Sequence, residues 1–274
     1  MRREGGQVTG HQELFSLADK RVLVTGASGH LGSALVRWLV ADGAHVYLLD
    51  RDLGQLTVVA NGLEETGLHQ LTLFSVDLEE RQAREDFARR LEGATPHLDG
   101  LVHNAAFVGT SAGEGWSTSF EKQTLEPWAR SLEVNLTAPF HLTQLLMPLL
   151  KKSLSPSIVS IGSIYGILGP DWGLYEGLEM GNPAGYAASK GGMIQLTRWL
   201  ATTLAPHIRA NSVSPGGIER SQPKEFVDAY VAKTPLRRMA NTQDIVGAIV
   251  FLLSDASAYI TGQNISVDGG FSAS

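Results

Sequence analysis

The sequence contains no cysteine, so disulfides, thiolate nucleophiles and cysteine-ligated zinc are all excluded. Charged residues make up only 18%, and 28 acidic against 22 basic residues give a net charge of −6, which offers no overall electrostatic support for nucleic-acid binding. No apolar run approaches the roughly 20 residues of a membrane-spanning helix. Residues 1–19 contain no apolar segment of the kind found in a signal peptide. We therefore expect a cytoplasmic enzyme with a small-molecule substrate, bound to neither nucleic acid nor membrane.

What the chain does contain is a regular alternation of short apolar runs and amphipathic stretches. This alternation predicts an α/β fold, a single-domain Rossmann-like doubly wound seven-stranded parallel sheet with helices on both faces. We expect a flexible lead-in over residues 1–19 and one catalytic domain over residues 20–274. The predicted strands are 21–25, 44–50, 70–76, 98–103, 157–161, 208–213 and 264–267, and the predicted helices are 31–42, one ending near 66, 79–92, 125–150 with a bend near Pro139, 186–205 and 244–254.

Two long segments interrupt the alternation, residues 106–124 after the fourth strand and residues 165–185 after the fifth. Long loops in compact domains are usually functional or disordered. Both segments follow the carboxyl end of a strand, where open α/β sheets bind ligands. We interpret them as walls of a substrate site, with tolerated surface insertions as the alternative.

A glycine-rich turn, Thr25-Gly-Ala-Ser-Gly-His-Leu-Gly32, lies between the first predicted strand and the first helix. Glycines permit a tight turn and a close approach of the backbone to a pyrophosphate, while the helix N-terminus supplies free N–H groups and a partial positive charge. The position at a strand–helix junction therefore predicts a dinucleotide site. The residues expected to form it are Gly26, Ser28, Gly29, His30, Leu31 and Gly32.

Asp50 lies 18 residues after Gly32, at the end of the second predicted strand. A carboxylate at this place can accept hydrogen bonds from both hydroxyls of the adenosine ribose and would repel a 2′-phosphate. We therefore expect NAD as the cofactor. Arg51 is the counter-argument, since a nearby arginine can accommodate the 2′-phosphate of NADP, which remains the alternative.

Tyr186 and Lys190 are four residues apart in a predicted helix, which places them on one face. A nearby ammonium favours the phenolate, so we expect Lys190 to lower the pKa of Tyr186. Tyr186 can then act as general acid or base on a carbinol or carbonyl oxygen. Ser163, just after the fifth strand, offers a hydroxyl to hold and polarise that oxygen, and Asn135 can hold a water that links Lys190 to solvent.

In their order and spacing these motifs resemble the short-chain dehydrogenase/reductase family, from about Leu14 to Phe271. The resemblance implies that Tyr186 is the acid–base, that Lys190 binds the nicotinamide ribose, that Ser163 orients the substrate and that Asn135 maintains a proton relay. It also implies that Asp77 and Leu78 flank the adenine and that Asn104 stabilises the sheet beside the cofactor. The remaining residues that it assigns to the cofactor site are Ala105, Ala106, Pro215, Gly216 and Ile218.

Several features depart from the family pattern, among them Ala106 where the family's Asn-Ala-Gly motif after the fourth strand has glycine. The glycine turn reads TGxxGxxG, as in the family's longer sugar-nucleotide-modifying members, where single-domain members usually carry TGxxxGxG. Glu219 and Arg220 stand where a threonine often contacts the nicotinamide amide, which puts that contact in doubt. Ser163 and Tyr186 are 23 residues apart, so the loop between them is expanded.

The expanded loop also resembles oxidoreductases of bacterial flagellin-glycosylation and nonulosonic-acid pathways. Trp172 and Tyr175 could stack on a sugar or base, and Arg220 and Lys224 could meet a phosphate. The alternative is that the aromatic residues pack the loop against the body and that the basic ones are solvated. We expect hydride transfer between NAD(P) and a hydroxyl or ketone of a sugar or nucleotide-sugar. A general ketone or 3-oxoacyl reductase and a cofactor-binding sensor without turnover are the alternatives.

The two long predicted helices, 125–150 and 186–205, carry apolar residues on more than one side. One face must cover the sheet, and a second could pair with another copy. With the family resemblance this favours a homodimer or homotetramer, while extra burial within the monomer is the alternative. The eight histidines show no metal-ligand spacing, so we expect no metal, and His103, in a predicted strand, is interpreted as a satisfied core residue.

Overall fold

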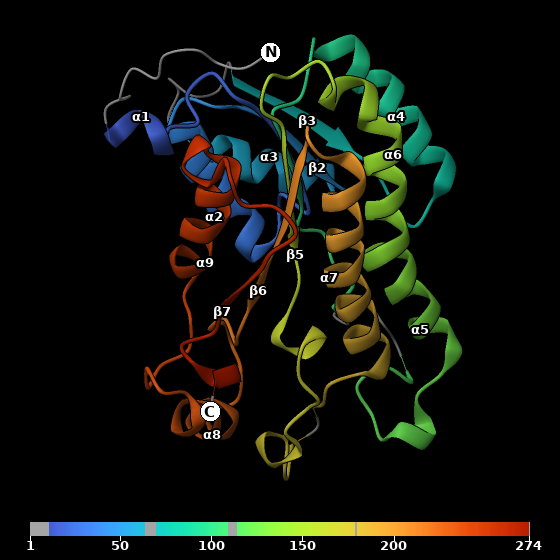
Figure 1. The fold of residues 1–274 in the computed structure, drawn as a ribbon. Helices are drawn as coiled ribbons and strands as arrows, with labels where there is room; N and C mark the ends of the chain where they lie inside the picture. Colours follow the sequence, from blue (N-terminus) through green and yellow to red (C-terminus); the bar gives the residue numbers. More distant parts are fainter. Residues whose placement is uncertain (1–10, 64–69, 109–113, 179, 274) are drawn as a thin grey trace.

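A computed structural model describes residues 11–63, 70–108, 114–178 and 180–273. Seven strands form one parallel sheet in the order β3-β2-β1-β4-β5-β6-β7, which confirms the predicted fold class (Figure 1). Because all the strands run the same way, their carboxyl ends meet at one edge. The strands are β1 (Arg21–Thr25), β2 (His45–Asp50), β3 (Leu71–Ser75), β4 (Gly100–His103), β5 (Ser157–Ile161), β6 (Arg209–Pro215) and β7 (Asn264–Val267).

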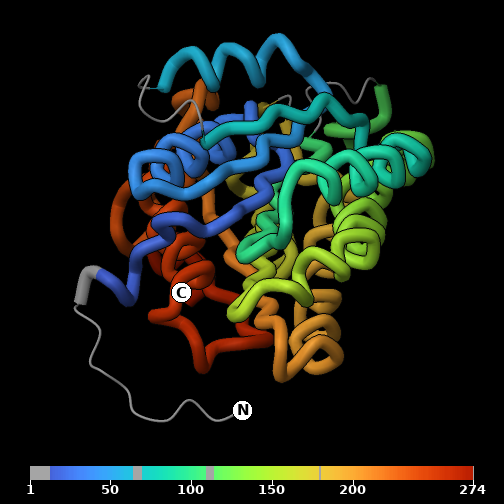
Figure 2. The backbone as a smooth tube through the Cα atoms, turned by 90° about the horizontal axis from the view of Figure 1, so that it is seen from above, coloured from blue at the N-terminus to red at the C-terminus, as the bar shows by residue number. Residues whose placement is uncertain are grey.

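Helices cover both faces of the sheet, and Figure 2 shows the two groups on opposite sides. α2 (His30–Ala41), α3 (Leu53–Asn61) and α9 (Thr242–Leu253) pack on one face, and α4 (Arg81–Ala94), α6 (Ala138–Leu150) and α7 (Ala184–Leu204) pack on the other. Neighbouring strand residues alternate between the two cores, as Val22 and Leu23 show. Burial on both faces explains why the strands are apolar runs in the sequence.

The predicted helix over residues 125–150 is three segments. α5 (Leu125–Leu132) leads into a π-helical turn, η3 (Glu133–Thr137), and α6 follows. The interruption therefore begins at Glu133, earlier than the bend expected near Pro139, which lies in the first turn of α6, where a missing N–H is tolerated. Single π turns are frequent at functional sites, and this one contains Asn135.

Two helices were not predicted. α1 (His11–Phe15) falls inside the expected flexible lead-in, and Leu17 beyond it is 1% exposed. Leu17 thus packs into the core, and residues 1–10 lie outside the described part. The flexibility of residues 1–19 stays a prediction. α8 (Lys224–Lys233) follows β6 and buries Phe226 and Tyr230 against the segment after β5.

The other predicted elements are found with shifts of a few residues at their ends. The largest concerns α3, which ends at Asn61, whereas a helix reaching about residue 66 was expected; residues 64–69 lie outside the described part. Part of the first long loop, residues 109–113, lies outside it as well. Among the described residues no helix is long and apolar enough to span a membrane.

Candidate active site

A cleft of about 410 Å³ opens at the carboxyl ends of β1 to β4, a size typical of small-molecule sites. It lies where the sequence places the dinucleotide. The segments that follow these four strands form much of its wall. The predicted cofactor residues that line it are Gly26, Ser28, Gly29, His30, Leu31, Gly32, Asp50, Arg51, Asp77, Leu78, Asn104, Ala105 and Ala106.

The glycine turn fits a pyrophosphate. Gly26 has φ +64°, and a β-carbon there would lie 2.7 Å from the Cα of Ala105, while one on Gly32 would collide with the Gly26 carbonyl oxygen. The Asn104 side chain donates to the carbonyls of Gly26 at 2.9 Å and Thr25 at 3.0 Å, which holds the turn against β4. No side chain caps the N-terminus of α2, so the backbone N–H groups of its first turn remain available to an anion.

Asp50 is fixed beside this turn. Its Oδ2 accepts from the Ser28 backbone N–H at 3.1 Å and from the Ser28 hydroxyl at 2.6 Å, and its Oδ1 accepts from the Arg51 N–H at 2.8 Å. The carboxylate thus forms part of the cleft wall at the end of β2. Arg51 lines the same cleft, so both groups on which the NAD and NADP interpretations depend are present at the site.

Ser163, Tyr186 and Lys190 come together at the start of α7. The hydroxyls of Ser163 and Tyr186 are hydrogen-bonded. The Lys190 ammonium lies 5.8 Å from the centre of the Tyr186 ring and donates to the Ile161 carbonyl at 2.7 Å. Lys190 is 3% exposed, and this burial lowers its pKa to about 8. The two side chains therefore share one helix face, as their spacing predicts.

The electrostatic expectation for Tyr186 needs correction. Burial raises its pKa above the ordinary value, and the hydrogen bond from Ser163 and the charge of Arg220 only partly oppose this. Tyr186 packs with Phe107 and is half-buried, while the Lys190 ammonium is directed at a backbone carbonyl. The protein's own groups thus move the pKa of Tyr186 upward, not downward.

Asn135 is 1% exposed, and its side chain is fully engaged. Its Oδ1 accepts from the Phe107 N–H at 2.7 Å, and its Nδ2 donates to the Ser189 hydroxyl at 3.0 Å and to the Phe107 carbonyl at 3.3 Å. Its own carbonyl lacks an α-helical donor, because the residue four positions later, Pro139, has no N–H. A water bound by Asn135 would therefore sit on this carbonyl and not on the amide.

Three residues of the site, Phe107, Val134 and Tyr165, were not singled out in the sequence. Phe107 and Val134 line the cleft and pack with Tyr186, which joins the cleft to the catalytic group. Tyr165 and Tyr175 hydrogen-bond through their hydroxyls, and both interact electrostatically with Tyr186. Burial raises the pKa of both phenols, so both remain protonated donors. Only the place of Tyr165, two residues after Ser163, could have signalled this.

Two aromatic residues were expected to stack on a sugar or base, and two basic residues were expected to meet a phosphate. In each pair the structure places the two residues differently. Trp172 is 58% exposed, whereas Tyr175 packs on Phe226 of α8 with ring centres 5.5 Å apart. Arg220 lines the cleft. Lys224 is ion-paired with Asp228 and does not line this cleft among the described residues, so the solvated alternative holds for it.

Five predicted cofactor residues, Tyr186, Lys190, Pro215, Gly216 and Ile218, do not line the cleft among the described residues. Pro215 ends β6, Gly216 borders a smaller cavity, and Ile218 pairs with Ala240. Their contact with the cofactor stays a prediction.

His103 is only partly satisfied. Its Nε2 is 2.9 Å from the Thr143 hydroxyl, but its buried Nδ1 has no partner among the described residues. Burial lowers its pKa to about 3, so the ring is neutral and belongs to the core. No group of three His, Asp or Glu residues in the described part could hold a metal ion.

The chain matches known proteins over nearly its whole length. The model of a family described as enoyl-(acyl carrier protein) reductase matches residues 26–272. A tropinone reductase homolog of Arabidopsis thaliana is 36% identical, with 94% of each chain covered. The post-translational flagellin modification protein A of Campylobacter coli is 28% identical, with 93% of this chain and 99% of that protein covered.

Solved structures agree with this. A short chain dehydrogenase of Leptospira borgpetersenii with bound NAD+ has a TM-score of 0.83 and 33% identity, with 99% of each chain covered. The Pseudomonas aeruginosa RhlG/NADP active-site complex also has a TM-score of 0.83, with 27% identity and 94% and 98% of the two chains covered. The chain belongs to the short-chain dehydrogenase/reductase family and is an NAD(P)-dependent oxidoreductase.

Proposed function

We propose that the protein transfers a hydride between NAD and the carbinol or carbonyl carbon of a hydroxylated substrate, with Tyr186 as the general acid–base. The closeness of the Ser163 and Tyr186 hydroxyls carries this proposal, because it brings two hydroxyl groups to one place. A substrate oxygen placed there can bond to both. The Lys190 ammonium one helical turn away completes the site.

Different residues of the site bind different parts of the cofactor. Backbone N–H groups at the start of α2 bind the pyrophosphate, and Asp50 accepts from the ribose hydroxyls of the adenosine half. Lys190 donates to the hydroxyls of the nicotinamide ribose. The bound cofactor supplies the hydride in reduction and accepts it in oxidation.

Tyr186 moves the proton that accompanies the hydride. In oxidation the carbinol O–H proton goes to the Tyr186 phenolate, and in reduction the Tyr186 O–H protonates the forming alkoxide. Ser163 holds the same oxygen by a hydrogen bond. Since burial raises the pKa of Tyr186, the phenolate needs the positive charges of Lys190 and of the oxidised nicotinamide nearby.

Asn135 serves the return of that proton to solvent. Its side chain fixes Phe107 and Ser189, the residue before Lys190, and its carbonyl is left without an α-helical donor. A water on this carbonyl would lie on the route from Lys190. The role of Asn135 is thus to hold one water and the helix that carries Lys190.

The polar groups around Tyr186 support a hydroxylated substrate. The hydrogen-bonded pair of Tyr165 and Tyr175 has one phenolic O–H left to donate, and Arg220 adds a positive charge that suits a phosphate. A sugar or nucleotide-sugar matches this chemistry, and the likeness to a flagellin modification protein is in keeping with it. A ketone or 3-oxoacyl reductase is the second candidate, favoured by the description of the matching family model.

The helices beside the active site support a homodimer or homotetramer. Large apolar side chains are exposed on α5, α6 and α7, and contact with a second copy would remove them from water. They are Leu125, Trp128, Phe140 and Trp199.

Replacing Tyr186 with Phe removes the proton donor and keeps the ring. We expect turnover to fall by about 10²–10⁴-fold while the NADH dissociation constant stays nearly unchanged. Tyr259→Phe is the matched control, since Tyr259 is fully exposed away from the site. Steady-state kinetics and fluorescence titration provide the two measurements. Full activity of Tyr186→Phe would contradict the role of Tyr186 as general acid–base.

The burial of Lys190 predicts a pH dependence of cofactor binding. With a pKa of about 8, Lys190 is charged below this pH and loses its charge above it. NADH affinity should therefore be constant at lower pH and weaken as the pH rises through 8. Lys190→Met should bind more weakly without this transition. An identical transition in Lys190→Met would assign the titration to another group.

The same shift has a consequence for folding. The pKa of Lys190 in the folded protein is below its ordinary value of 10.5, so burying the ammonium costs stability below pH 8. The free energy of unfolding should therefore rise between pH 8 and 10.5 in the wild type relative to Lys190→Met. Urea titrations of the two proteins measure the difference.

Asp50 is expected to set the choice of cofactor. Asp50→Ala removes the acceptor for the ribose and the repulsion of a 2′-phosphate, so the ratio of kcat/KM for NAD to that for NADP should fall by about tenfold or more. Asp86→Ala is the control, because Asp86 bonds to Gln82 and Arg89 at the exposed surface of α4 and is not among the described residues that line the cleft. A wild-type preference for NADP that Asp50→Ala leaves unchanged would contradict the assignment.

The substrate class can be tested by comparing sugar nucleotides and free sugars with acyl thioesters and simple ketones, with the change in cofactor absorbance as the readout. We expect turnover with a sugar derivative, and Tyr165→Phe should raise its KM more than it lowers kcat. Turnover of thioesters or ketones alone would support the second candidate function instead.

A further inference from the structure

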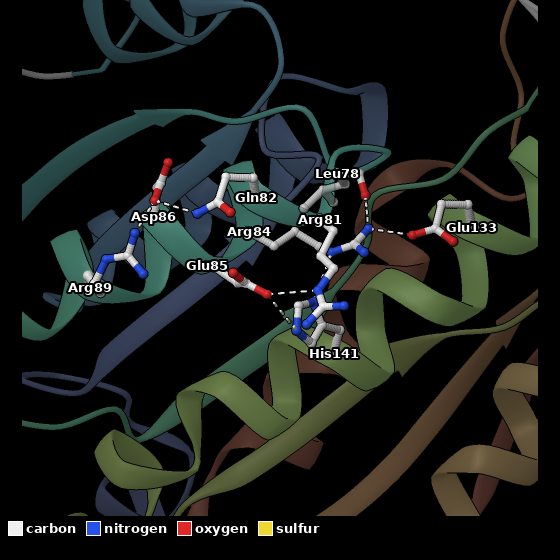
Figure 3. Close-up of polar contacts among 9 residues, drawn as sticks. All are labelled: Leu78, Arg81, Gln82, Arg84, Glu85, Asp86, Arg89, Glu133 and His141. Atoms are coloured by element: carbon white, nitrogen blue, oxygen red, sulfur yellow. Dashed lines mark hydrogen bonds and ion pairs between the residues drawn. The ribbon is translucent and has the colours of Figure 1, made fainter.

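Arg84 is a buried cation on a helix that is otherwise charged and largely exposed. Its side chain is only 3% exposed. The guanidinium donates to acceptors from three segments (Figure 3): the Leu78 carbonyl, Glu133 Oε1 at 2.6 Å and His141 Nδ1 at 3.1 Å. Burying a charge is costly unless it is paired and hydrogen-bonded, so the buried guanidinium requires these acceptors.

The three acceptors join two parts of the site. Leu78 lies between β3 and α4 and lines the cleft at the wall assigned to the adenine. Glu133 begins the π turn that contains Asn135, and His141 lies in α6 just beyond that turn. Burial, with the charge of Arg84, lowers the pKa of His141, so its ring stays neutral and Nδ1 can accept. Arg84 therefore contacts Glu133 at the start of the Asn135 turn and His141 beyond its end.

A second ion pair links the same two segments. Both Arg130 Nε and Nη2 donate to the Glu79 carboxylate at 2.8 Å, and Glu79 also lines the cleft. The Arg130 guanidinium lies 4.8 Å from the centre of the Phe107 ring, and the backbone of Phe107 bonds to Asn135. Residues 78–84 thus contact the surroundings of Asn135 at several points.

The turn itself needs such support. A π turn lacks the regular α-helical bonding pattern, and Pro139 supplies no N–H to it. We propose that Arg84 and Glu133 are positioning residues that hold the Asn135 turn against the adenosine wall of the cleft, so that cofactor binding at this wall orders the proton relay. This inference rests on the function proposed for Asn135. The pair acts through Asn135 and touches no reacting atom.

The test compares Glu133→Gln with Asp86→Asn in the full chain. Glutamine keeps an acceptor oxygen for Arg84 but removes the charge, whereas Asp86 bonds to Arg89 and Gln82 at the exposed surface of the same helix. In Glu133→Gln, amide hydrogen exchange over residues 134–138 should be about ten- to a hundredfold faster, and NADH should slow it less than in the wild type. Exchange in β5, and all exchange in Asp86→Asn, should match the wild type.

A catalytic readout separates positioning from stability. On a substrate found in the screen above, Glu133→Gln should lower kcat about tenfold with little change in substrate KM, and the solvent deuterium isotope effect on kcat should rise because the proton relay becomes slower. Arg84→Lys keeps the charge but not the planar fork, and it should show the same changes.

The possible results are distinct. Wild-type exchange and isotope effect in both Glu133→Gln and Arg84→Lys would overturn the inference. Faster exchange throughout the chain, or failure of both variants to fold, would also overturn it, because the pair would then serve the whole fold. Activity retained in Tyr186→Phe would contradict the proposed function instead, and the local exchange result would still decide whether Arg84 and Glu133 position the turn.

Discussion

The backbone of the turn after β1 touches the backbone of the segment after β4, and the cofactor cleft depends on this contact. Neither Gly26 nor Gly32 has room for a β-carbon there, and Asn104 ties the two segments together by donating to the Gly26 carbonyl. The contact leaves the N-terminus of α2 facing the cleft without a side-chain cap. An anion bound at this place compensates for N–H groups that the fold leaves unpaired.

Burial has opposite effects on the pKa values of the two catalytic groups. It raises the pKa of the Tyr186 phenol and lowers that of the Lys190 ammonium to about 8, so each group is moved toward its neutral form. The two pKa values therefore move apart, since the ordinary values are 10.0 for the tyrosine and 10.5 for the lysine. Hydrogen bonding from Ser163 and the positive charge of Arg220 favour the phenolate. The charge of an oxidised nicotinamide would act in the same direction.

Much of the fold follows from local patterns in the sequence. The strands are buried on both faces and appear as apolar runs, and the glycine turn and the spacing of Tyr186 and Lys190 need only neighbouring residues to be recognised. Other features depend on distant contacts. α8 is recognisable only once Phe226 and Tyr230 meet the segment after β5. Arg84 is buried because acceptors from Leu78, Glu133 and His141 surround it.

The same distinction holds within the site. Asn135 could be named from its motif, but the π turn around it depends on the packing of α5 and α6. The pairing of Tyr165 with Tyr175 joins two positions of an expanded loop whose conformation no local pattern fixes. The direction of the Tyr186 pKa was mistaken for a similar reason, since sequence spacing reveals the charge of a neighbour but not the loss of water.

The central claim is that Tyr186 and Ser163 hold the reacting oxygen beside a dinucleotide bound along this cleft. A crystal structure with NAD+ tests it most directly. The account predicts the adenosine ribose at Asp50, the nicotinamide ribose at Lys190, and the nicotinamide ring facing the gap beside the Ser163 and Tyr186 hydroxyls. A nicotinamide bound away from these hydroxyls, or a Tyr186 side chain turned out of the cleft, would contradict it.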